Sequence, residues 1–353
     1  MVARRGRTLI TFLYHESEHR QHSAAAQRRN LEFFLREGVS PALQNARYHF
    51  AIVLTSSCVT PRLPTAAAAG RLTVHDLNGS QGYELFNYKR FVSTRWCGSA
   101  GRPSGCSAPC GTASAGLASA GLANRSDVDA RTFEFFVLIA DTTRGPFLPN
   151  YVRPAFWPDL ITDRLTSTIK LVGPSINCFG CDRDRRWCSG RVQRLHSEGH
   201  MLATDRVGLQ MLTSYWKRPG SKSDDILHNE MGMTKMILDH GYNVASLQLF
   251  WRSHDFRDTN RTQRKCAVLR RHALYDTNGL VSCPGCHWNE TDLNPLEVLF
   301  VHRSLSYDKA RGFEVGATRA YSEQRDELDL LDDSHHSVVA LSGEATCQVA
   351  CPL

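Results

Sequence analysis

Two apolar segments separated by a helical pattern open the chain and constrain its fold more than any other feature. The first, "RTLITFLYHE", is rich in β-branched and aromatic residues and ends in polar ones, as a strand entering a loop does. Residues 24–39 place Leu31, Phe34 and Leu35 on one helical face, with Gly38 as the expected stop. A second apolar strand follows in "RYHFAIVLTSS". Strand, helix and strand in about fifty residues predict a parallel βαβ unit.

The same alternation continues along the chain. "RLTVHDLNGSQGYELFNYKRF" reads as a strand, a polar turn and a helix, and "TFEFFVLIAD" reads as a buried strand. Further strands in "IKLVGPSI" and "GHMLATD" alternate with helical patterns at 205–215 and 228–241. We therefore predict one α/β domain of Rossmann-like type, with a mixed, mainly parallel sheet flanked by helices. Residues 1–98 and 127–307 form its two halves, and the acidic segment 308–353 is expected to be weakly ordered.

A change of composition separates the two halves. Residues 99–126, "SAGRPSGCSAPCGTASAGLASAGLANRS", are rich in Gly, Ala and Ser and lack large apolar side chains. Such a segment cannot offset the entropy of ordering it, so we predict a disordered insertion.

The overall composition is that of an ordinary soluble globular protein, with 22% charged and 9% aromatic residues. The net charge of +7 is spread along the chain and gives a weak bias toward anionic ligands such as phosphates. Without a long basic run, nucleic acid is not an expected partner. No stretch approaches the length of a membrane span, and the apolar run 8–14 is too short for a signal-peptide core. The expected location is the cytoplasm, or the Golgi if an anchor precedes Met1.

Asp141 ends the apolar strand in "FFVLIADTTRGPF", and Arg144 follows three residues later. An acid at the carboxyl end of a parallel strand faces the crevice where α/β folds bind ligands, and it could hold a hard cation or a ribose hydroxyl. Arg144 could clamp a phosphate. Equally, Asp141 could begin a turn or cap Thr142 and Thr143.

Glu230 lies in the first turn of the helix predicted from "HNEMGMTKMILDHGY", which Gly241 ends. The helix macrodipole favours an acid there by about 0.3–1 kcal/mol, which alone could explain it. The other interpretation is a general base directed into an active site.

The twelve cysteines permit disulfides without requiring them. Two CxxC pairs, Cys178 with Cys181 and Cys283 with Cys286, could instead supply a tetrahedral zinc site. Their separation of about a hundred residues is longer than zinc ribbons use, so disulfides or buried thiols are favoured. Four N-glycosylation sequons begin at Asn78, Asn124, Asn260 and Asn289, and they matter only if the chain enters the secretory pathway.

Four segments in order give the chain a resemblance to a known family. "VLIADTTRGPF", "FWPDL…STIKLVGPSINC", "VQRLHSEGHMLATDRVGLQML" and "EMGMTKMILDHGY" resemble glycosyltransferases of the rhamnan-synthesis-F-like type, within the GT-A class. The resemblance runs from about Thr8 to Arg303, apart from the insertion. It implies transfer of a sugar from a nucleotide diphosphate to a glycan or other acceptor hydroxyl.

The resemblance also implies site residues. Tyr14 and Glu16 would lie near the nucleotide base, and Asn78, Gly82 and Glu84 would border the donor nucleotide, although Glu84 stands where Asp is commoner. "ADTTRGP" occupies the place of the metal-binding Asp-x-Asp, but Thr143 replaces the second acid. Asp141 would therefore hold a manganese or magnesium ion alone or with His302, and Arg144 would add positive charge. His200 and Asp205 would face the acceptor as further catalytic residues.

The implied mechanism is direct displacement with inversion. Glu230 would take the proton from the acceptor hydroxyl while the diphosphate leaves. Two alternatives stay open: a zinc-stabilised interaction protein that uses the two CxxC pairs, and a glycosyltransferase-like protein that has lost catalysis.

Overall fold

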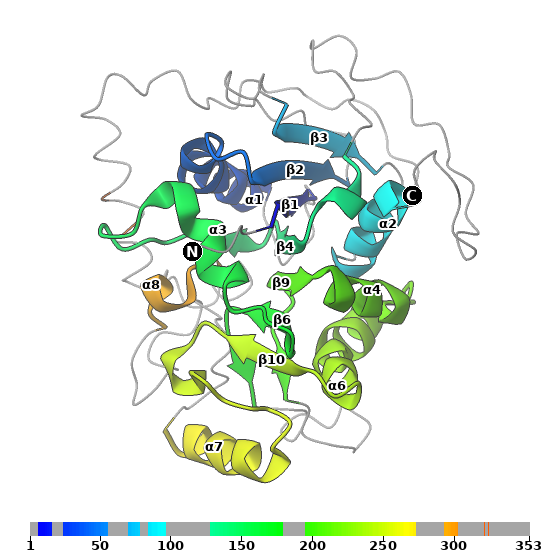
Figure 1. Cartoon of the computed structure of the whole chain (residues 1–353), viewed down its shortest axis with the longest axis vertical. Helices are drawn as coiled ribbons and strands as arrows, with labels where there is room; N and C mark the ends of the chain where they lie inside the picture. The colour runs from blue at the N-terminus through cyan, green and yellow to red at the C-terminus, as the bar shows by residue number, and fades with distance from the viewer. Residues whose placement is uncertain are drawn as a thin grey trace.

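A computed structural model describes residues 6–15, 24–55, 70–77, 84–96, 128–178, 195–272 and 293–302, with Tyr321 and Gln324. The predicted insertion at 99–126 and nearly all of the predicted tail at 308–353 lie outside these residues. The described part forms a central sheet with helices on both faces (Figure 1).

The central sheet has seven strands, and β9 alone among them runs antiparallel to its neighbours. In spatial order the strands are β3 (Leu72–Asp76), β2 (Tyr48–Leu54), β1 (Thr8–Tyr14), β4 (Phe135–Ala140), β9 (Met201–Asp205), β6 (Ile169–Gly173) and β10 (Asn243–Ser246). The prediction of an α/β fold with a mixed, mainly parallel sheet is confirmed. The order also reverses between β1 and β4, since β2 and β3 extend one way from β1 and β4 lies on its other side.

Alternate side chains of the sheet enter two separate cores, as the period of two along a strand requires. Leu9 and Leu13 of β1 join the core beneath three helices: α2 (Glu84–Trp96), α4 (Arg206–Tyr215) and α6 (Met231–Asp239). Ile10 and Phe12 join the core on the opposite face, beneath α1 (Ala24–Phe33), the π-helix η1 (Phe34–Val39) and α3 (Trp157–Thr162). The molecule is thus a three-layer α/β/α arrangement (Figure 1).

Two short antiparallel ladders lie outside the central sheet. β5 (Thr143–Arg144) pairs with β11 (Val301–His302), and β7 (Ile176–Asn177) pairs with β8 (His196–Ser197). The remaining helical elements are η2 (Ser40–Ala42), η5 (Ala130–Thr132), η6 (Pro154–Phe156), α5 (Lys222–Asp224), η7 (Asp225–Glu230), η8 (Leu249–Trp251), α7 (Thr259–His272) and α8 (Pro295–Val298).

Gly38 does not end the first helix, so that detail of the prediction is wrong. The chain stays helical through η1 and η2, and Gly38 lies inside η1. Its carbonyl accepts a hydrogen bond from the Trp157 indole at 2.7 Å, and an added Cβ would lie 2.9 Å from Cδ of Pro146. The glycine allows this close packing. Gly241, by contrast, follows α6 at φ +80°, where a glycine ends a helix without steric cost.

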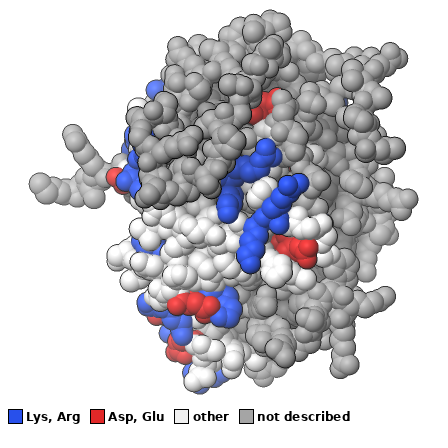
Figure 2. Space-filling model, turned by 90° about the vertical axis from the view of Figure 1, so that its right-hand side faces the viewer, with Lys and Arg blue, Asp and Glu red and all other residues white. Residues whose placement is uncertain are grey.

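Lys and Arg side chains outnumber acidic ones on one face of the described surface. Figure 2 shows this on the side where α2, α4 and α6 lie in Figure 1. The observation agrees with the positive net charge of the chain. Among the described residues, no helix combines the length and apolar character needed to cross a membrane.

Candidate active site

The reversal of strand order places the carboxyl ends of β1 and β4 side by side. Leu13 pairs with Ala140 in parallel register, so Tyr14 and His15 leave the sheet next to Asp141. In open α/β sheets, ligands bind outside the carboxyl ends at such a switch point. The residues that surround Asp141 therefore form the candidate site.

Asp141 is held by three donors from β1 and α1. Its Oδ2 accepts hydrogen bonds from the His15 backbone N–H at 2.9 Å and from Gln27 Nε2 at 3.0 Å. Its carbonyl accepts one from Asn30 Nδ2 at 2.8 Å, and the residue is only 4% exposed. The first two donors satisfy the buried carboxylate, and the third satisfies the backbone carbonyl. Asp141 therefore does more than begin a turn, because its hydrogen bonds connect α1 to the carboxyl end of β4.

Arg144 belongs to the same buried cluster. Its Nε donates to Asn30 Oδ1 at 3.1 Å, so Asn30 bridges Asp141 and Arg144. Gly145 follows with φ +149°, and an added Cβ would lie 2.4 Å from the Leu299 carbonyl. Only glycine lets this turn approach the segment that leads into β11. The pairing of β5 with β11 then brings His302 opposite Thr143.

Two histidines meet beside this ladder. The rings of His200 and His302 have centroids 5.4 Å apart. His200 lies immediately before β9, and its carbonyl accepts from the Ala140 N–H and the Thr143 hydroxyl, each at 2.9 Å. Because β9 is antiparallel, its beginning lies at the carboxyl ends of β1 and β4.

The His200 imidazole is buried and neutral. Burial above all, and then the neighbouring His302, hold the pKa of His200 well below 6.5, although a hydrogen bond to the Phe300 backbone acts in the opposite direction. Its Nε2 has no hydrogen-bond partner among the described residues. The atom has almost no exposed surface, so a ligand would reach it only if the surrounding side chains moved.

Glu230 reaches the same region through Gly199. Its Oε1 accepts the Gly199 backbone N–H at 2.6 Å, and Gly199 precedes His200. Glu230 is half-buried at the point where η7 passes into α6. The structure therefore brings Asp141, Arg144, His200 and His302 together, with Glu230 beside the start of β9.

Asp205 lies at the opposite edge of the sheet, and this contradicts the catalytic role predicted for it. It pairs with Phe135 at the start of β4, six residues and about 20 Å of strand from Asp141. Its Oδ1 caps α4 by accepting from the Gly208 N–H at 2.9 Å, and its Oδ2 forms an ion pair with Lys170 Nζ at 2.5 Å. The residue serves as a helix cap and a partner for a buried lysine.

The predicted nucleotide contacts are only partly described. Tyr14 ends β1 at the expected edge, but its side chain is 1% exposed and packs in the core beneath α1 and η1. Glu84 begins α2, and its side chain is not described. Glu16, Asn78 and Gly82 lie outside the described residues.

The described residues do not fit a protein-held manganese or magnesium ion. An ion held by the protein alone needs several oxygen ligands, yet Asp141 Oδ2 already accepts two hydrogen bonds, Thr143 directs its hydroxyl to the His200 carbonyl, and Arg144 places a cation in the same cluster. No group of three or more His, Cys, Asp or Glu side chains within the described ranges could hold a metal.

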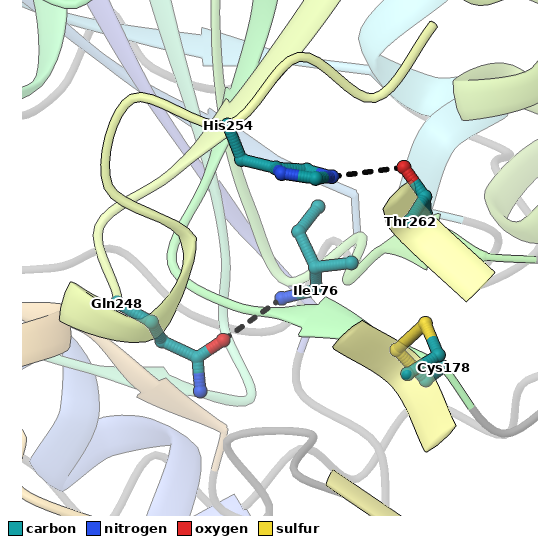
Figure 3. The surroundings of a disulfide bond; sticks show 6 residues. Ile176, Cys178, Gln248, His254 and Thr262 are labelled. Atoms are coloured by element: carbon teal, nitrogen blue, oxygen red, sulfur yellow. Dashed lines mark hydrogen bonds between the residues drawn. A yellow bond between two sulfur atoms is a disulfide. The ribbon is translucent and has the colours of Figure 1, made fainter. Parts of the chain in front are cut away.

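The predicted zinc site does not match the state of Cys178. Cys178 forms a disulfide with Cys266 of α7, so it is not free to ligate zinc with Cys181 (Figure 3). Cys181, Cys283 and Cys286 lie outside the described residues.

Sequence reasoning missed the polar residues of α1. Gln27 and Asn30 share a helical face with Leu31 and Phe34, and both are buried. Polar residues on an apolar helical face signal a buried partner, which is Asp141 here. Glu198, a second half-buried carboxylate next to Gly199, was also missed; it accepts from Asn177 Nδ2 at 3.4 Å.

The fold and the cluster define an α/β protein with a polar site at the carboxyl edge of a mainly parallel sheet. No protein-family model matches the chain, and a search of curated proteins finds no significant match.

Proposed function

We propose that this protein is a glycosyltransferase that moves a sugar from a nucleotide diphosphate to an acceptor hydroxyl, with Glu230 as the general base. The observation that carries the proposal is the hydrogen bond from Gly199 to Glu230. It fixes a half-buried carboxylate next to His200, at the edge where β4 delivers Asp141. The resemblance in four sequence segments supplies the reaction class.

The cluster offers groups suited to each part of such a substrate. In this proposal, the side chains around His200 move when substrate binds, and Nε2 then accepts a hydrogen bond from a sugar or acceptor hydroxyl. Arg144 supplies positive charge near the departing diphosphate. Asp141 holds β1, α1 and β4 in place around them.

In the proposed reaction, Glu230 accepts the proton of the acceptor hydroxyl. The hydroxyl oxygen forms a bond to the anomeric carbon on the face opposite the diphosphate, and the bond between that carbon and the diphosphate oxygen breaks. The configuration inverts, and the diphosphate leaves with the electron pair. For proton transfer, Glu230 must lie within about 3 Å of the hydroxyl or one water away.

Two measurements test the proposal. A panel of nucleotide sugars should raise the melting temperature with at least one member, because a ligand that binds only the folded state stabilises it. With that donor and a panel of glycan acceptors, Glu230→Gln should lower kcat by about 10²- to 10⁴-fold and leave donor binding intact. Asp239→Asn, which removes an exposed carboxylate from α6, is the matched control and should retain full activity.

The outcomes separate the alternatives. If no nucleotide sugar stabilises the protein, the transferase proposal fails. Donor binding without turnover by the wild type indicates a protein that has lost catalysis. Equal turnover by wild type and Glu230→Gln leaves Glu230 with only a structural role, its contact with Gly199.

A further inference from the structure

The disulfide between Cys178 and Cys266 fastens α7 to the end of β7. Its Cα atoms are 5.5 Å apart, and 88 residues separate the two cysteines in sequence. Both are buried, Cys178 at 2% and Cys266 at 7% exposure. Such bonds form and persist in oxidising compartments and are rare in the cytosol. Formation requires an oxidised disulfide carrier, which takes two electrons and two protons from the thiols.

The same helix begins with an N-glycosylation sequon, Asn260-Arg261-Thr262. The buried face of α7 carries Thr262, Cys266 and Leu269, whereas Asn260 is exposed. Two residues correspond to about 200° of rotation around a helix, so Asn260 points away from the face that Thr262 buries. A group attached to Asn260 would extend into solvent without entering the core.

The start of α7 does not depend on the Asn260 side chain. Asp258 Oδ1 accepts the Arg261 N–H at 2.9 Å, and the Asp258 carbonyl accepts the Thr262 N–H at 2.9 Å. The Thr262 hydroxyl is 2.8 Å from His254 Nε2 (Figure 3). Loss or modification of Asn260 thus disturbs none of these contacts.

From these observations together, we propose that Asn260 is an N-glycan acceptor in a chain that folds in an oxidising compartment. The bond formed joins Asn260 Nδ2 to the anomeric carbon of a sugar. The bond broken joins that carbon to the diphosphate of a lipid-linked oligosaccharide, and the amide loses one proton. Thr262 is buried in the folded protein, so the transfer precedes the docking of α7. This inference does not depend on the proposed transferase activity.

The test is peptide mapping of the full chain isolated from the cells that make it. Treatment with peptide-N-glycosidase in heavy-oxygen water should convert Asn260 to a labelled Asp. A non-reducing digest should contain the Cys178–Cys266 peptide pair. An unlabelled Asn260 would show that this residue carries no glycan, even if Asn78, Asn124 or Asn289 is labelled. Free thiols at both cysteines would show that the chain does not fold in an oxidising compartment.

Variants expressed through a eukaryotic secretory pathway provide a second readout. Asn260→Gln should remove one glycosidase-sensitive step in gel mobility and leave the melting temperature unchanged. Thr262→Ser keeps both the sequon and a hydroxyl for His254, so it should retain that step. If wild type and Asn260→Gln migrate identically before deglycosylation, Asn260 carries no glycan.

Discussion

The Gly199 backbone N–H donates to Glu230 Oε1 across 2.6 Å, and this contact joins the start of β9 to the entry of α6. Two segments about thirty residues apart in sequence thereby share one edge of the sheet. The prediction that Glu230 lies in the first turn of its helix is wrong, because the helical segment runs unbroken from Lys222 through η7 into α6. The Glu230 carboxylate binds the residue that precedes His200.

Gly199→Ala should displace Glu230 without unfolding the protein. An added Cβ would lie 2.9 Å from Glu230 Oε1 and 3.1 Å from its Cδ, so the carboxylate must shift. If Glu230 is the base, we expect kcat to fall by about 10- to 100-fold, since such misplacement affects the chemical step. The free energy of unfolding should fall by no more than about 1–3 kcal/mol. Steady-state kinetics and urea denaturation measure the two effects.

Gly220→Ala is the control for this change, because its added Cβ would meet only Asp224 Oδ2, at 3.0 Å and on the surface. It should behave as wild type in both assays. Unchanged kcat in Gly199→Ala would show that the position of Glu230 does not matter for turnover.

Asp205→Asn should affect stability and spare activity. The amide retains an oxygen to cap α4 but leaves the Lys170 ammonium, 7% exposed, without its charge partner. Breaking such a pair costs roughly 3 kcal/mol. Chemical denaturation should show this loss, while kcat stays within about twofold of wild type at a temperature where both proteins are folded. A large fall in kcat would restore the catalytic role that the geometry contradicts.

Removal of the disulfide should destabilise the protein substantially. With a sequence separation of 88 between Cys178 and Cys266, the chain-entropy relation assigns roughly 4–5 kcal/mol to the cross-link. We expect the denaturation midpoint of wild type to fall in reductant. The double variant Cys178→Ser with Cys266→Ser should show the low midpoint with or without reductant. Equal midpoints for wild type in both conditions would mean that the bond is not formed in solution.

Stability should decrease as the pH falls from about 6.5 to about 4. Burial above all lowers the pKa of His49 to about 4, with Arg7 adding to the effect. Burial likewise lowers the pKa of His254 to about 4, with Lys265 and then Arg261 contributing. Between the two pH values the unfolded chain binds more protons than the folded one, so stability rises with pH across that window.

Replacement of one buried histidine tests the assignment. His49→Gln should flatten the dependence of the unfolding free energy on pH between 6.5 and 4. An unchanged slope in His49→Gln would assign the acid sensitivity to other groups.

The fold was largely predictable from sequence, and the reasons are local. The apolar runs of β1, β2 and β4 could only be buried strands, and Gly241 marked the end of α6 because that position requires positive φ. Asp141 was identified because it ends a buried strand. The prediction that Gly38 ends the first helix was wrong, because the role of this glycine depends on Trp157 and Pro146, which are distant in sequence.

The site was less predictable because its geometry depends on strand direction and on long-range partners. Asp205 was misassigned because the sequence of β9 does not reveal that the strand runs antiparallel, which moves its end to the far edge. The pairing of Cys178 with Cys266 could not be read from the CxxC spacing, which suggested zinc ligation with Cys181 and did not involve Cys266. Gln27 and Asn30 required knowledge of which face α1 buries.

The reversed direction of β9 has a consequence for how this protein can vary. In the parallel strands β1 and β4, the residues that follow the strands lie at the candidate site, and the residues that precede the strands lie at the opposite end of the sheet. Because β9 runs in the opposite direction, the residues that precede it lie at the candidate site and the residues that follow it do not. If the protein is a transferase, variation in acceptor choice should therefore fall just upstream of Met201, in the turn that carries Gly199 and His200, whereas the turn after Asp205 has only to support the start of α4.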